Sequence, residues 1–242
     1  MGGRRILCNV NDPEEMGLWV RVAKASLKSS SYNLTSGPPT PKYYDLDEFV
    51  LGRKEDNIYS QGDNAKEIKK AADKFFSKIT LLEKEHNIRL DKIAFIDKGG
   101  VGPVGMISFL AMAASKAGKA IIIVRPRKRL VSASIKGQIV KGDNVLILSD
   151  VATSGTSIYM AAQKIWHLGG KIPCALVWID RQLGARENLE QYGIKLYSIV
   201  DPQILALNSN ELKKAIKEDK QEKCYIDFGG NSKTSVYSAL MQ

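Results

Sequence analysis

The chain has 242 residues, of which 44% are hydrophobic and 26% are charged, and its formal net charge is +10 at pH 7. Its size and composition predict a soluble globular protein with one large domain, or one domain with short extensions. No apolar run reaches the length of a membrane-spanning helix, and the first residues show no secretory signal, so we expect a cytoplasmic protein without a membrane partner. The positive charge favours acidic partners and is also compatible with nucleic acid.

Three cysteines, Cys8, Cys174 and Cys224, lie far apart in the sequence and form no CxxC pair. This spacing indicates reduced thiols rather than a metal site or a disulfide framework. Cys174 lies within an apolar strand pattern, so we expect it in the core.

Strands and helices are predicted to alternate along most of the chain. The first 50 residues mix charge, glycine and proline, and apolar residues at helical spacing then predict a helix over 65–85. Strands are predicted at 92–96, 120–124, 145–148, 172–179 and 195–200, and further helices at 104–117, 157–168 and 185–192. Continuous apolar strands separated by helices predict an α/β fold, a parallel sheet with helices on both faces. Ligands of such sheets bind at the carboxyl ends of the strands, where Asp97, Arg125, Asp150 and Asp180 fall.

Residues 144–158 carry the most informative pattern in the chain. The apolar run Val145–Leu148 is followed by Asp150, by the hydroxyl- and glycine-rich stretch Thr153–Ser157, and then by a helical pattern. Unpaired N–H groups at a helix start suit a phosphate, and Gly155 lets the backbone approach it closely. A carboxylate at the strand tip accepts hydrogen bonds from sugar hydroxyls. The pattern therefore predicts a site for a phosphorylated sugar; the alternative is an ordinary strand-to-helix turn rich in capping residues.

A glycine-rich loop follows the first strand of the sheet. Gly100–Gly105 matches the GxGxxG fingerprint of dinucleotide-binding proteins. That fingerprint requires a carboxylate at the end of the second strand, where this chain has the basic run Arg125–Arg129. An NADP site is compatible with the arginines and stays open as an alternative.

The motif at 145–157 resembles the phosphoribosyl diphosphate (PRPP) motif of type I phosphoribosyltransferases. Two further segments are similar to the orotate phosphoribosyltransferases of that family: Ile179–Leu189, with its run Asp-Arg-Gln-Leu-Gly-Ala-Arg, and Leu34–Leu46. The resemblance implies a small N-terminal hood at residues 1–60, a phosphoribosyltransferase core at 61–205, and a C-terminal helix and tail at 206–242.

The resemblance also implies transfer of the phosphoribosyl group of PRPP to orotate, with Mg²⁺ carried by PRPP and no metal ligand from the protein. Arg181 would bind the orotate carboxylate, and Asp150 the ribose. The 5′-phosphate would bind Thr153, Ser154, Gly155, Thr156 and Ser157, and the pyrophosphate would bind Lys98, Gly99, Gly100, Val101, Gly102 and Arg125. In relatives a mobile basic loop reaches the partner subunit's site, which implies a homodimer and a catalytic role for Lys128 or Arg129.

Three residues differ from the family pattern. Ser149 stands where relatives have an acid, and Thr35 and Pro126 stand where they often have lysine. A second hypothesis is therefore a catalytically weakened regulator that binds PRPP or nucleotides, for which nucleic acid is a possible partner. The basic loop at 125–129 also fits an exposed surface turn or a nucleic-acid contact, and Arg181 also fits an ion pair with Asp180 or Glu187.

Overall fold

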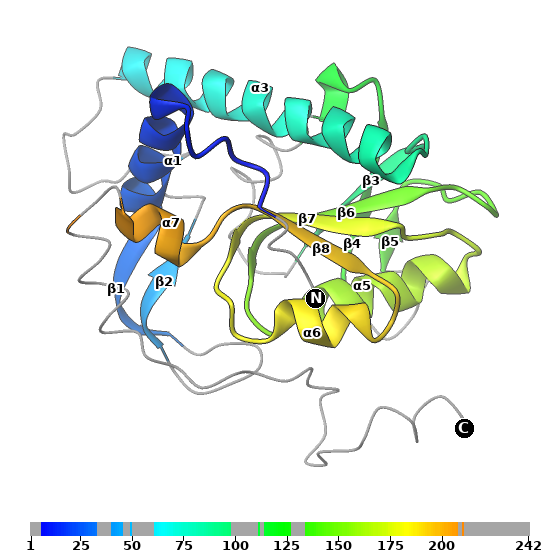
Figure 1. The fold of residues 1–242 in the computed structure, drawn as a ribbon. Coiled ribbons are helices and arrows are strands. Elements are labelled where there is room, and N and C mark those ends of the chain that lie inside the picture. The colour runs from blue at the N-terminus through cyan, green and yellow to red at the C-terminus, as the bar shows by residue number, and fades with distance from the viewer. Residues whose placement is uncertain are drawn as a thin grey trace.

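A six-stranded sheet with strand order β5-β4-β3-β6-β7-β8 forms the centre of the molecule in a computed structural model of the chain (Figure 1). The structure describes residues 6–32, 40–45, 49, 61–97, 111, 114–126, 134–207 and 210. The short β5 is antiparallel to β4 and the other pairs are parallel, which confirms the predicted α/β class with a mainly parallel sheet. The strands are β3 (Lys92–Ile96), β4 (Ala120–Val124), β5 (Ile135–Lys136), β6 (Val145–Ala152), β7 (Cys174–Asp180) and β8 (Lys195–Val200).

Helices cover both faces of this sheet, as predicted. α1 (Pro13–Ser26) and α3 (Gln61–His86) lie on one face, and α5 (Thr156–His167) and α6 (Ala185–Glu190) lie on the other (Figure 1). Side chains of a strand point alternately to the two faces. In β6, Leu146 and Leu148 accordingly join the core beneath α1 and α3, whereas Val145 and Ile147 join the core beneath α5. Burial on both faces explains the continuous apolar runs in the sequence.

The predicted strands 92–96, 120–124 and 195–200 coincide with β3, β4 and β8. Two boundaries were wrong. β7 begins at Cys174 rather than at residue 172, and β6 continues past Leu148 to Ala152, because Ser149, Val151 and Ala152 pair with Val177, Ile179 and Asp180 of β7. Asp150 therefore lies inside β6, two residues before its last residue, rather than after the end of the strand.

The helix predicted over 65–85 lies within α3, and those over 157–168 and 185–192 correspond to α5 and α6. Within the helix predicted over 104–117, the structure describes residues 111 and 114–117. Of these, residues 111 and 114–116 are helical. Cys8 and Cys174 are buried free thiols, and burial raises their pKa to about 11 and about 12. Both stay protonated at neutral pH; Cys224 lies outside the described residues.

The N-terminal part of the chain forms a separate two-stranded sheet and also joins the edge of the central sheet. β1 (Leu27–Tyr32) and β2 (Thr40–Tyr44) form an antiparallel hairpin, which contacts the core where the Tyr44 ring meets Trp178 edge-on at 5.8 Å between centroids. The backbone N–H groups of Leu7 and Cys8 donate to carbonyls of Ser198 and Ile199, so this segment continues the sheet beyond β8. The domain boundaries at residues 60 and 205 stay a prediction.

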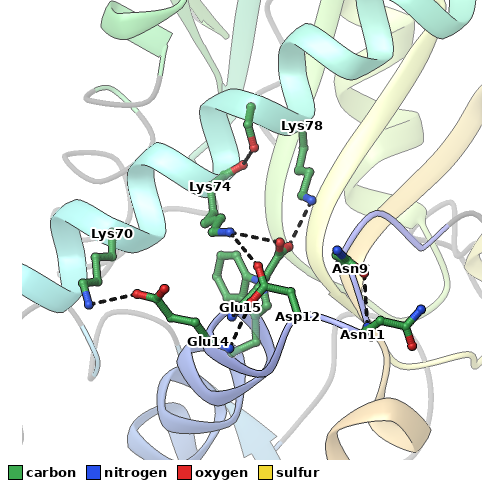
Figure 2. A network of polar contacts seen from close by, with 10 residues as sticks. Asn9, Asn11, Asp12, Glu14, Glu15, Lys70, Lys74 and Lys78 are labelled. Carbon is green, nitrogen blue, oxygen red and sulfur yellow. Dashed lines mark hydrogen bonds and ion pairs between the residues drawn. The ribbon is translucent and has the colours of Figure 1, made fainter.

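α1 is fixed to α3 by a network of ion pairs (Figure 2). The Glu15 carboxylate is 3% exposed and lies 3.0 Å from Lys78 Nζ and 3.2 Å from Lys74 Nζ. Asp12 caps α1 by accepting from the N–H groups of Glu14 and Glu15, and it also pairs with Lys74 at 3.3 Å. The last helix, α7 (Pro202–Leu207), packs beside α1 (Figure 1). Within the described residues, no helix is both long and apolar enough to cross a membrane.

Candidate active site

The candidate site residues lie along one edge of the sheet, at the carboxyl ends of four adjacent strands. Arg125 follows β4, Asp97 follows β3, Asp150 lies near the end of β6, and Arg181 follows β7. Asp97, Arg125 and Asp150 thus stand at the strand ends where they were predicted, and Asp180, the last residue of β7, lies at the same edge. This arrangement follows from parallel pairing, which places all carboxyl ends on the same side.

The turn between β6 and α5 has the geometry of an anion-binding loop. Gly155 precedes the helix with φ 86°, a left-handed conformation that side chains disfavour. A Cβ at this position would lie 2.9 Å from Leu189 Cγ and 3.3 Å from the Ala185 carbonyl oxygen, so α6 also excludes a side chain. In an α-helix the first N–H groups lack intrahelical acceptors, which in α5 applies to Ser157 and Ile158.

The hydroxyl groups predicted to meet a phosphate divide into two kinds. Ser154 and Thr156 are each 2% exposed, and their hydroxyls bond to one another at 2.8 Å. The Thr156 N–H also donates to Ser154 Oγ at 3.3 Å. Thr153 and Ser157 are partly exposed. Ser154 and Thr156 therefore stabilise the shape of the turn, while Thr153 and Ser157 are the hydroxyls open to a ligand.

Asp150 has a neighbour that orients its carboxylate. Ser149 is 5% exposed, and its hydroxyl donates to Asp150 Oδ1 at 3.0 Å. The residue that replaces the first acid of the family motif is thus a hydrogen-bond donor to the second. A carboxylate held in this way presents acceptor oxygens in a defined direction.

Arg125 and Asp97 form an ion pair between the ends of β4 and β3. Arg125 Nε lies 2.7 Å from Asp97 Oδ2, and the Arg125 side chain is 36% exposed. The Asp97 N–H donates to the Val124 carbonyl, which fixes the two strand ends against each other. The cation predicted to bind pyrophosphate is therefore held at the sheet edge by a carboxylate.

Arg181 lies on a tightly bonded segment after β7. It is 6% exposed, and its N–H donates to the Ala152 carbonyl at the end of β6, at 3.0 Å. The adjacent Asp180 is 1% exposed; its Oδ2 accepts from Arg186 Nε at 2.7 Å and its Oδ1 from the Gln182 N–H at 2.9 Å. Burial raises the pKa of the Asp180 carboxyl, outweighing the opposite effects of the Gln182 N–H and Arg186. Asp180, one of the two partners considered for Arg181, thus forms its ion pair with Arg186.

Sequence reasoning missed most of this network. Arg186 also donates to Ser198 Oγ at 3.0 Å, and Gln182 Nε2 donates to Asp201 Oδ2 at 2.7 Å. Gln182 has φ 60°, which is unusual outside glycine. The signal in the sequence was a pair of opposite charges, Asp180 and Arg186, six residues apart at a strand end and on the following helix, but their contact depends on the turn between them.

The residues predicted for the pyrophosphate loop and the catalytic loop lie outside the described residues, except Arg125. They are Lys98, Gly99, Gly100, Val101, Gly102, Lys128 and Arg129, and Thr35 also lies outside the described residues. Among the residues that are described, no group of three or more His, Cys, Asp or Glu side chains is positioned to hold a metal ion.

Comparison with known proteins shows to which family the chain is related. No family model matches it. An orotate phosphoribosyltransferase of Pyrococcus horikoshii is 30% identical over 181 residues, which cover 74% of this chain and 86% of that protein. The chain belongs to the orotate phosphoribosyltransferase family. A second orotate phosphoribosyltransferase, from Staphylothermus marinus, is 34% identical over 178 residues, 72% of this chain and 74% of that protein.

The fold agrees with this family. The crystal structure of orotate phosphoribosyltransferase from Aeropyrum pernix superposes with a TM-score of 0.59 at 24% identity, over 78% of this chain and 98% of that one. Family membership confirms the resemblance predicted from residues 145–157, 179–189 and 34–46. The roles of the individual site residues stay predictions.

Proposed function

We propose that the protein is an orotate phosphoribosyltransferase, which transfers the phosphoribosyl group of PRPP to orotate in pyrimidine nucleotide biosynthesis and releases pyrophosphate. Membership of the orotate phosphoribosyltransferase family carries this proposal. The described geometry supports it, since the oriented carboxylate of Asp150, the turn after β6 and the buried guanidinium of Arg181 after β7 lie at the same edge of the sheet.

Each described group then has a task. The N–H groups at the start of α5, with the Thr153 and Ser157 hydroxyls, bind the 5′-phosphate. Asp150 accepts hydrogen bonds from the ribose hydroxyls. The Arg181 guanidinium binds the orotate carboxylate, for which its planar fork of donors is suited. A ring nitrogen of orotate loses its proton to solvent and forms the new bond to C1, as the bond from C1 to the pyrophosphate oxygen breaks and the electron pair leaves with pyrophosphate.

The leaving pyrophosphate needs positive charge near it. Under the proposal, Arg125 and the loop residues Lys98–Gly102 contact the pyrophosphate, and Lys128 or Arg129 acts from a partner subunit of a homodimer. Mg²⁺ bound to the PRPP oxygens supplies further charge neutralisation; its ligands would come from PRPP. A cytoplasmic location suits such an enzyme, and the two buried free thiols agree with a reducing compartment.

Ser149 was one of three replacements behind the regulator hypothesis. Its hydrogen bond to Asp150 gives it a task in the same subsite, so the lost negative charge is accompanied by a gained donor. This supports the enzyme over a catalytically weakened relative.

The experiment is calorimetric titration of the purified protein with PRPP and Mg²⁺, followed by orotate and by measurement of orotate absorbance. Binding followed by loss of orotate is expected, with uracil and adenine as control bases that are not consumed. Binding of PRPP without turnover of orotate would contradict the enzyme and favour the regulator. Absence of PRPP binding would overturn both.

A further inference from the structure

The phosphate-binding turn is supported from behind by α6. The Gly155 backbone packs against Leu189 and the Ala185 carbonyl, both of α6, and the Arg181 N–H holds the start of the same segment to Ala152. The side chain of Asn188 adds a polar contact in this packed layer: its Nδ2 donates to the Ser154 carbonyl oxygen at 2.8 Å.

This hydrogen bond fixes the orientation of one peptide group. In a planar trans peptide the C=O of one residue and the N–H of the next point in opposite directions. Because the Ser154 carbonyl points toward Asn188 on α6, the Gly155 N–H points away from α6. Thr153 and Ser157, the partly exposed residues of the turn, flank this peptide, and the first N–H groups of α5 follow it.

Without a hydrogen bond, the peptide between Ser154 and Gly155 could adopt either of two orientations. A peptide group that precedes a glycine reverses its direction at small cost, because glycine adopts both positive and negative φ. Reversal here would replace an N–H donor on the side of the turn that faces away from α6 by a carbonyl oxygen, which repels an anion.

Resting on the proposed function, we propose that Asn188 is a positioning residue for the 5′-phosphate of PRPP. It acts without touching the substrate, by holding the peptide between Ser154 and Gly155 so that the Gly155 N–H faces the phosphate. The segment that carries Arg181 toward orotate thereby also sets the affinity for PRPP.

The test measures the two phosphate groups of PRPP separately. Wild type, Asn188→Ala, Asn188→Asp and the control Gln191→Ala, an exposed position at the end of the same helix, are titrated with ribose 5-phosphate and, separately, with pyrophosphate. PRPP and orotate kinetics and melting temperatures are measured on the same four proteins.

For Asn188→Ala we expect the dissociation constant of ribose 5-phosphate and the KM for PRPP to rise about 3- to 10-fold, the worth of a neutral hydrogen bond. Asn188→Asp keeps the shape but loses the donor and adds a charge, so its loss should be larger, on the order of 10- to 100-fold. Pyrophosphate affinity, the KM for orotate and the control should stay at wild-type values. This result supports the inference whether or not orotate is consumed.

Three results would overturn it. Ribose 5-phosphate affinity within twofold of wild type in both variants would remove the inference and leave the proposed function intact. Equal losses for ribose 5-phosphate and pyrophosphate, with a lower melting temperature, would show a general structural role instead. Wild type that binds neither ribose 5-phosphate nor PRPP would overturn the proposed function, and the inference with it.

Discussion

At the scale of single residues, Ser149 shows how one replacement in a motif changes the chemistry of its neighbour. An acid beside Asp150 would add charge near the ribose, whereas the Ser149 hydroxyl at 3.0 Å donates to Oδ1. The hydroxyl donor orients the Asp150 carboxylate. Because position 149 carries no acid, Asp150 also has no like-charged neighbour there to repel it. Ser149 is therefore expected to act through Asp150.

Ser149→Ala tests this role. A hydrogen bond to a charged group contributes about 1.5 to 3 kcal/mol, so kcat/KM for PRPP should fall about 10-fold or more while the KM for orotate stays unchanged. Ser149→Thr keeps the hydroxyl and should retain most of the activity. Steady-state kinetics on both variants are the measurement; equal activity of Ser149→Ala and wild type would show that Asp150 needs no such donor.

Arg181 gives a second prediction at this scale, because it separates base recognition from PRPP binding. Arg181→Ala removes the guanidinium fork and should raise the KM for orotate on the order of 100-fold. Arg181→Lys keeps the charge without the fork and should recover only part of that loss. Calorimetric titration should find PRPP affinity unchanged in both. If PRPP affinity fell with the KM for orotate unaltered, Arg181 would have a role in the packing of the β6 and β7 ends instead.

At the scale of elements, the spacing of apolar residues predicted the helices and strands whose buried side chains recur at a regular interval. α3, β3, β4 and β8 follow the apolar spacing closely. α1 was missed, because no element was predicted in the first 50 residues with their mixture of charge, glycine and proline. Asp12, Pro13 and Glu14 nevertheless form a good start signal, and Met16, Trp19 and Ala23 share one buried face. The two-residue β5 and the end of β6 carry no continuous apolar run, and their pairing with β4 and β7 defines them.

Gly155 tests the join between β6 and α5. Gly155→Ala faces both the positive φ of 86° and the contact with Leu189, whereas Gly193→Ala faces a φ of 73° with nothing within 4 Å of the new Cβ. The conformational cost of about 1–2 kcal/mol is common to both, so Gly155→Ala should lose more stability than Gly193→Ala and also weaken PRPP binding. Urea unfolding and PRPP titration measure the two effects. Equal destabilisation would mean that Leu189 moves aside freely.

At the scale of the whole molecule, the sheet edge that carries the candidate site was predictable from the sequence, because the alternation of strands and helices implies a parallel sheet. Parallel strands bring Asp97, Arg125, Asp150 and Asp180 to one edge whatever their side chains contact. The pairings themselves were not predictable: Asp97 with Arg125, Asp180 with Arg186 and Gln182 with Asp201 depend on turn geometry that no periodic pattern encodes. Asn188 was missed for the same reason.

The attachment of α1 to α3 makes the stability of the whole molecule depend on pH. Burial raises the pKa of Glu15, but the hydrogen bonds and charges of Lys78 and Lys74 outweigh it, and the net pKa lies below its ordinary value of 4.5. The stabilisation from Glu15 is therefore fully present above pH 4.5 and is lost as pH falls through the lower, folded-state pKa. The pKa of Lys74 is raised above 10.5, because Glu15 and Asp12 outweigh the effect of burial, so its contribution is lost only as pH rises beyond that value.

Glu15→Gln should accordingly cost about 3 to 5 kcal/mol at pH 7, because it leaves Lys78, a mostly buried cation, without its charged partner. The cost should shrink as pH falls from 4.5 toward the lower pKa of folded Glu15, because the wild-type carboxylate is then progressively protonated and resembles the variant. Asp180, whose raised pKa has the opposite sign of pH dependence, is present in both proteins and cancels in the difference.

Glu14→Gln is the matched control for Glu15→Gln. Glu14 is the preceding residue of α1 and pairs with Lys70 on the exposed side of the same network (Figure 2). A pair at such an exposed position contributes at most about 1 kcal/mol. Urea unfolding of the three proteins at pH 7 and at pH 3.5 gives the comparison. A cost for Glu15→Gln that is the same at both pH values would assign it to packing against Trp19 rather than to charge.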